Sequence, residues 1–167
     1  IGLMNGGGIR GDRLYPAGAS LTRRDILSEL PFGNTTVLVA IDGATLREAL
    51  ENGYSDLGRP SGRFLQVSGL DVALDPNAAP GRRVVSATVG GAALDDARTY
   101  RVAANDFMLR GGNDYGMLAR GRVLIGGTDG RLLANEVMAY IRAHTPLPVE
   151  AGGRIRVLPL GPPSAQQ

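Results

Sequence analysis

The stretch Ile-Gly-Leu-Met-Asn-Gly-Gly-Gly-Ile-Arg, residues 1–10, joins an apolar run directly to three glycines and an arginine. The apolar run predicts a buried strand, and the glycines predict a sharp turn at its end. Residues without Cβ let backbone N–H groups converge on an anion, and the guanidinium of Arg10 adds a planar set of donors. The stretch therefore indicates either a phosphate or carboxylate site, or a turn whose glycines only solve a packing problem.

The composition bounds the remaining possibilities. The chain of 167 residues fits one domain, and it contains no cysteine, which excludes disulfides, thiolate catalysis and zinc–cysteine sites. Its 18 basic residues are all arginine and are spread along the chain, so we expect no nucleic-acid partner. We find no signal peptide pattern and no apolar span long enough for a membrane helix. Because the chain begins on Ile in an apparent strand, we expect a piece of a longer protein.

Strand and helix patterns alternate along the chain. Helices are predicted at residues 23–30 and 45–53, capped by Thr22 and Thr45, and a longer helix follows a predicted cap at Thr128. Gly-Gly at residues 90–91 predicts a tight hairpin turn. Strands are predicted at residues 1–4, 35–41, 63–67, 70–74, 83–89, 92–94, 99–103, 123–125 and 154–158. This order predicts an α+β fold in which one mixed β-sheet is layered with helices.

Four motifs follow one another in a specific order. They are Asn-Gly-Gly-Gly-Ile-Arg at residues 5–10, Leu-Pro-Phe-Gly-Asn at 30–34, Gly-Arg-Phe-Leu-Gln-Val-Ser-Gly at 62–69, and Asn-Asp-Phe-Met-Leu-Arg-Gly-Gly-Asn at 105–113. In this order and spacing the chain resembles the C-terminal domain of the 5'-nucleotidase family. The resemblance covers residues 1–158, a substrate-binding domain whose upstream part is truncated, and leaves residues 159–167 as a tail.

The resemblance implies how such a domain works. It binds the nucleoside part of a nucleotide and presents the phosphate to a divalent metal pair, for example zinc or manganese, on a separate N-terminal metallophosphoesterase domain. Phe32 and Phe107 would sandwich the base, Arg10 would contact the phosphate, and Gly62 would let the backbone approach the ligand. The implied substrate-binding residues are Asn5, Arg10, Phe32, Gly62, Phe107, Asn113 and Asp114. Without the resemblance, each phenylalanine would be read as a core residue.

One position departs from the family pattern. The family carries Gly-Gly-Asp-Gly, with the Asp accepting hydrogen bonds from the ribose hydroxyls, whereas this chain has Gly-Gly-Asn-Asp at residues 111–114. Asn113 can accept through its amide oxygen but brings no charge. The alternatives are weaker ribose binding through Asn113, a different sugar-like ligand, or a shift of one residue that gives the role to Asp114.

The chain has one histidine, His144, which we place at the C-terminal end of the last helix. A two-metal phosphoesterase site needs several His, Asp and Asn ligands, so we expect no metal site and no hydrolase activity in this chain alone. Joined to its metal domain, it is expected to serve a periplasmic or secreted enzyme that hydrolyses nucleoside 5'-phosphates.

Three other functions stay open. The first is a related hydrolase acting on a nucleotide sugar, a cyclic nucleotide or a thiosulfo group. The second is a non-catalytic ligand-binding or adhesion module, for which the Arg-Gly-Asp tripeptide at residues 10–12 is the only sign. The third is a domain that has lost nucleotide binding and only supports its partner domain.

Overall fold

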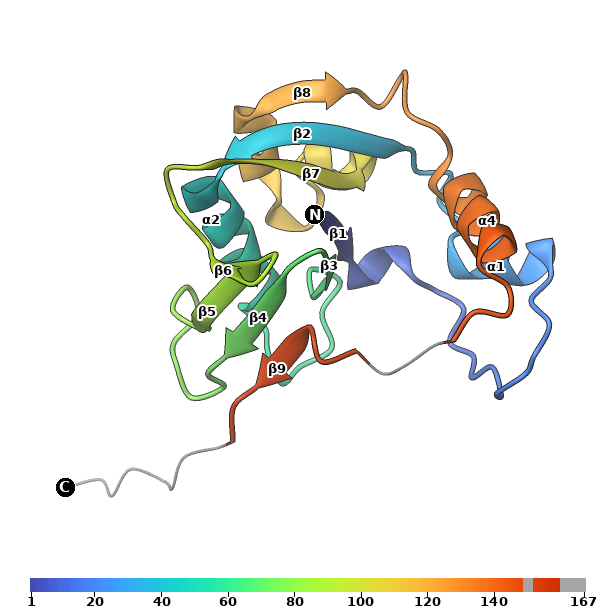
Figure 1. Ribbon diagram of the computed structural model, residues 1–167, viewed down its shortest axis with the longest axis horizontal. Coiled ribbons are helices and arrows are strands. Elements are labelled where there is room, and N and C mark those ends of the chain that lie inside the picture. Colours follow the sequence, from blue (N-terminus) through green and yellow to red (C-terminus); the bar gives the residue numbers. More distant parts are fainter. Residues whose placement is uncertain (149–151, 160–167) are drawn as a thin grey trace.

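The computed structural model describes residues 1–148 and 152–159, and its strands form two sheets (Figure 1). The first sheet has the order β3 (Leu65–Ser68), β1 (Gly2–Asn5), β7 (Thr99–Asn105), β2 (Thr36–Asp42) and β8 (Arg122–Ile125). The second has the order β6 (Ala92–Ala93), β5 (Val84–Val89), β4 (Asp71–Leu74) and β9 (Ile155–Val157). Each sheet holds parallel and antiparallel pairs, so the predicted α+β fold with mixed pairing is confirmed.

The prediction of one sheet is wrong, and the reason lies at Gly69. This glycine has a φ of 70° and separates β3 from β4, which are almost consecutive in the chain. β3 pairs with β1 in the first sheet, whereas β4 pairs with β5 and β9 in the second. A backbone turn that favours glycine thus lets the chain leave one sheet and enter the other.

The helices are α1 (Arg23–Glu29), α2 (Gly43–Tyr54), α3 (Asp106–Leu109) and α4 (Leu133–Ala143), with single 3₁₀ turns η1 (Gly6–Gly8), η2 (Gly112–Asp114) and η3 (Gly116–Arg120). α2 packs on the main core, where Leu46, Leu50 and Tyr54 are fully buried. α1 and α4 lie side by side, away from α2, around a small second core that includes Ile26 and Met138 (Figure 1). Among residues 1–148 and 152–159, no helix has the length and apolarity needed to cross a bilayer.

One of the three predicted helix caps is confirmed. The hydroxyl of Thr22 accepts a hydrogen bond from the Asp25 backbone N–H at 3.2 Å, and the Asp25 carboxylate accepts from the Thr22 N–H at 2.8 Å. This reciprocal pairing satisfies two N–H groups that the first turn of a helix leaves free. The predicted hairpin is also confirmed, because Gly90 and Gly91 both have positive φ between β5 and β6.

The other two caps are wrong. Asp42 caps α2, since its carboxylate accepts a hydrogen bond from the Thr45 N–H at 2.7 Å, so the helix begins two residues before Thr45. Thr128 caps no helix, because it lies in a turn after β8 and α4 begins only at Leu133. Leu132, which precedes α4, is held by a bridge to Thr35, and this tertiary contact sets where the helix starts.

Candidate functional site

The glycine turn η1 follows directly from β1 and is fixed by backbone contacts. The Gly6 N–H donates to the Phe64 carbonyl at 2.6 Å, and the Gly7 N–H donates to the Gly62 carbonyl at 2.8 Å. A Cβ on Gly7 would lie 3.0 Å from the Gly62 Cα, so two backbone segments meet where only glycine fits. These paired N–H groups do not converge on an anion, and the structure supports the packing explanation for these glycines.

A line of asparagine side chains runs behind this turn. Asn105, the last residue of β7, donates from Nδ2 to Asn5 Oδ1 at 2.8 Å, and Asn5 Nδ2 donates to Asn113 Oδ1 at 2.8 Å. Asn5 and Asn105 are each only 1% exposed. The role of Asn5 in ligand contact stays a prediction, and in this structure its buried side chain hydrogen-bonds to Asn113 and Asn105.

Asn113 and Asp114 lie in η2 with left-handed backbone angles, φ 52° and 62°. Asn52 holds this turn by donating from Nδ2 to the Asn113 carbonyl at 3.0 Å. Asp114 forms an ion pair with Arg63 at 2.6 Å, so its carboxylate is engaged by a cation at the protein surface. The structure thus brings Asn113, Gly62 and the glycine turn together and places Asp114 at the edge of this group.

Tyr115, the residue that follows η2, fixes the same turn through its buried side chain. Its ring is fully buried, and its hydroxyl donates to the Arg63 carbonyl at 2.6 Å. Burial raises the pKa of the Tyr115 hydroxyl well above its usual range, so this group stays a donor. Arg63 also lies 3.5 Å from Asp56, whose pKa is lowered by the hydrogen bond from the Ser61 hydroxyl and by the charges of Arg63 and Arg59.

Arg10 and Phe32 meet on the other side of the glycine turn. The Arg10 guanidinium carbon lies 5.5 Å from the centroid of the Phe32 ring. The backbone N–H of Arg10 donates to the Glu29 carbonyl at 2.9 Å. Phe32 is 54% exposed, far more than a core phenylalanine. It lines a cavity of about 240 Å³ together with Gly8 and Asn34, which places the ring beside the glycine turn.

Phe107 projects from α3 and is 38% exposed. Asn105 caps this short helix, since its Oδ1 accepts a hydrogen bond from the Met108 N–H at 2.8 Å. The Phe107 ring lies against bare backbone at Gly112, where a Cβ would approach Phe107 Cδ1 to 2.6 Å and two further ring atoms more closely. Phe107 is therefore positioned by the same segment that carries Asn113.

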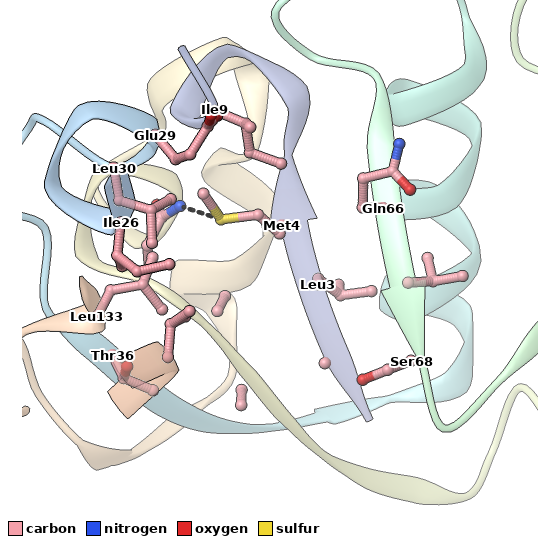
Figure 2. A pocket seen from close by; sticks show the side chains of 16 residues that line it. Leu3, Met4, Ile9, Ile26, Glu29, Leu30, Thr36, Gln66, Ser68 and Leu133 are labelled. Carbon is pink, nitrogen blue, oxygen red and sulfur yellow. Dashed lines mark hydrogen bonds between the residues drawn. The ribbon is translucent and has the colours of Figure 1, made fainter. Parts of the chain in front are cut away.

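A second cavity, larger than the one beside Phe32, lies elsewhere (Figure 2). It has a volume of about 480 Å³ and lies between β1, β3 and β7 on one side and α1 and α4 on the other. Its surface is largely apolar, with Leu3, Ile26 and Leu133 among the residues that line it. The polar residues in the lining are Glu29, Thr36, Gln66, Ser68 and Asn105. The seven predicted substrate-binding residues do not line this cavity.

Four residues that shape the site were not predicted: Asn52, Arg63, Asn105 and Tyr115. Asn105 carried a local signal, because an asparagine that ends a strand just before a helix is a preferred N-cap. Asn52 and Arg63 contact η2 from positions 61 and 51 residues away, and no local pattern reports such contacts.

Comparison with known proteins places the chain in a well-defined group. The family model described as 5'-nucleotidase, C-terminal domain matches residues 1–120. The chain is 38% identical over 125 residues to a snake venom 5'-nucleotidase of Naja atra, covering 70% of this chain and 24% of that protein. It is 35% identical over 122 residues to a trifunctional nucleotide phosphoesterase protein of Bacillus subtilis, covering 69% of this chain and 8% of that protein.

A solved structure is similar over nearly the whole chain. The crystal structure of a 5'-nucleotidase precursor from Thermus thermophilus superimposes with a TM-score of 0.82 at 39% identity. The match covers 97% of this chain and 32% of the Thermus chain. This chain thus spans less than a third of the length of each of these three relatives.

Proposed function

The chain belongs to the 5'-nucleotidase C-terminal domain family, and from this premise we propose that it binds a nucleoside or nucleotide. The observation that carries the proposal is the exposed Phe32 ring beside the Arg10 guanidinium at the glycine turn. An exposed aromatic ring can stack on a base, and a guanidinium can bind a phosphate through two parallel hydrogen bonds. Phe107, exposed at the neighbouring turn, supplies a second ring.

We propose that, in the full-length protein, this domain serves an enzyme that hydrolyses nucleoside 5'-phosphates. An N-terminal metallophosphoesterase domain would hold a divalent metal pair such as zinc or manganese, which generates the attacking hydroxide. The single histidine in this chain supports that division of labour, because a two-metal site draws on several histidines and carboxylates. A periplasmic or secreted location is proposed because relatives include a venom protein and a precursor.

A second candidate is a related hydrolase domain whose ligand carries a different sugar. The observation that favours it is Asn113, which stands where the resemblance to the family implies an acidic residue. Both candidates share the proposed base-binding rings and differ only at the sugar.

Calorimetric titration of the chain with adenosine and AMP tests the proposal. We expect Phe32→Ala and Phe107→Ala each to weaken binding by about 1–3 kcal/mol, which corresponds to roughly 5- to 150-fold in the dissociation constant. Tyr140→Ala is the matched control, because this ring on α4 is 57% exposed and lies outside the site. Equal binding by all three variants, or no binding by the folded chain, would refute the proposal.

A further inference from the structure

The asparagine line behind the glycine turn has a fixed direction. Side-chain amide oxygen and nitrogen have nearly the same shape, so hydrogen-bond partners decide which way each amide faces. The Met108 backbone N–H can only donate, so Asn105 must turn its oxygen to Met108 and its NH₂ group toward Asn5. Asn5 must then present its oxygen to Asn105 and its NH₂ group to Asn113.

Burial makes this direction costly to reverse. Asn5 and Asn105 are both 1% exposed, so water cannot replace a lost partner. A flip of either amide would set two donors or two acceptors against each other in the protein interior. The Met108 N–H therefore determines, through two side chains, that the oxygen of Asn113 faces inward.

The outward group of Asn113 is consequently its NH₂ group. A Cβ built on Gly62 would lie 3.3 Å from Asn113 Nδ2 and 3.7 Å from Oδ1, so the amide lies beside Gly62 with its nitrogen as the nearer atom. Within residues 1–148 and 152–159, Asn113 Nδ2 donates to no protein atom, whereas Oδ1 accepts from Asn5. A carboxylate at this position would also accept from Asn5, but its second oxygen would face outward as an acceptor.

We propose that Asn113 determines sugar specificity by presenting a hydrogen-bond donor, so that the site favours nucleosides whose sugar oxygens accept over those that must donate. This inference rests on the proposed nucleoside binding. Free ribose hydroxyls both donate and accept, whereas ether, ester and phosphate-ester oxygens only accept. The expected ligands thus include nucleosides and nucleotides whose sugar hydroxyls are substituted, alongside those whose hydroxyls are free. Asn105 acts as a positioning residue, since it orients Asn113 through Asn5.

The first test compares adenosine with 2',3'-di-O-methyladenosine, whose sugar oxygens can only accept. We expect the chain to bind the methylated compound no more than about threefold more weakly than adenosine. In Asn113→Asp the outward carboxylate needs a hydrogen-bond donor on the ligand, which the methylated compound lacks. We therefore expect this variant to bind the methylated compound about tenfold or more weakly than adenosine. Asn77→Asp is the matched control, because it adds the same charge at an exposed turn of the second sheet and should leave the ratio unchanged.

The second test uses Asn105→Asp, which does not alter Asn113. The carboxylate still accepts from the Met108 N–H but cannot donate to Asn5, so Asn5 should turn its NH₂ group toward residue 105. Asn113 should then turn its oxygen outward, and the ligand preference should resemble that of Asn113→Asp. In the unsubstituted chain, NMR scalar coupling across the hydrogen bond should run from Asn5 Nδ2 to the Asn113 carbonyl carbon of the side chain.

The outcomes separate the two proposals. Failure of the folded chain and of Asn113→Asp to bind either nucleoside refutes nucleoside binding, and this inference falls with it. Suppose that adenosine binding depends on Phe32, but the ratio of the dissociation constants of the two nucleosides is the same in Asn113→Asp as in the unsubstituted chain. This result refutes the specificity role of Asn113 alone. Coupling in the opposite direction, from Asn113 Nδ2 to Asn5, overturns the positioning role of Asn105 even where its variant fails to fold.

Discussion

Replacing Gly112 with alanine tests whether Phe107 must lie against the Gly112 backbone in order to stack on a bound base. The added methyl group would lie 2.6 Å from Phe107 Cδ1 and nearer still to two other ring atoms. Ordinary carbon–carbon contacts are about 3.5–4.0 Å, so the ring must move by roughly 1 Å or more. The backbone conformation of Gly112 is compatible with alanine, because its φ does not lie in the left-handed region that favours glycine.

The expected loss follows from the stacking role proposed for Phe107. A displaced ring gives up part or all of a stacking contact worth about 1–3 kcal/mol, so adenosine should bind roughly 5- to 150-fold more weakly to Gly112→Ala. Thermal unfolding should show a folded protein, since Phe107 is partly exposed and has room to turn outward. Gly116→Ala is the control, because a Cβ at that nearby position meets no atom within 4 Å.

A double-substitution cycle makes this prediction refutable. In a Phe107→Ala background the ring is gone, so Gly112→Ala should weaken adenosine binding no further. Unchanged binding by Gly112→Ala, when Phe107→Ala alone weakens it, would show that the ring tolerates displacement. Equal losses in both backgrounds would show that Gly112 acts through the backbone of η2 and not through Phe107.

Two further predictions concern acid stability and catalysis. Hydrogen bonds from Thr45 lower the pKa of Asp42 below its ordinary value of 3.8, so its stabilising contribution is complete above pH 3.8 and lost as the pH falls through the lower folded-state pKa. Asp42→Asn keeps a good cap without a titrating group, so its melting temperature should fall less steeply below about pH 4, and a parallel fall would contradict this account. The chain alone, supplied with zinc or manganese, should release no phosphate from AMP in a colorimetric assay. Metal-dependent release by the pure chain would refute the proposed division between two domains.

Local signals in the sequence predicted those features that depend on few neighbours. The Thr22 cap was recognisable because its partner Asp25 lies three residues away. At α2 the pattern at Thr45 predicted the wrong cap, because the helix begins where β2 ends, at Asp42. The start of α4 depends on a bridge between Leu132 and Thr35, which are far apart in the chain.

At the candidate site, too, the sequence predicted local features but not those that depend on distant residues. The motifs indicated which residues gather near the glycine turn, and the structure does place Asn113 and Gly62 together. The motifs could not show that Asn5 is buried, since that follows from its place at the end of a strand flanked by β3 and β7. They also could not show which atom of Asn113 faces outward, because that depends on the Met108 N–H acting through two other residues.

The apolar cavity between β1 and the α1–α4 pair affects how the purified chain will behave in solution. Water in contact with apolar side chains finds few hydrogen-bond partners, so its replacement by an apolar group is favourable. Detergent tails, dye molecules and neighbouring protein molecules in a concentrated sample would all compete for this space. Salting-out anions strengthen that tendency, and phosphate is one of them. Dilute samples in a buffer without sulfate or phosphate are therefore the proper condition for measuring how this chain binds a nucleotide.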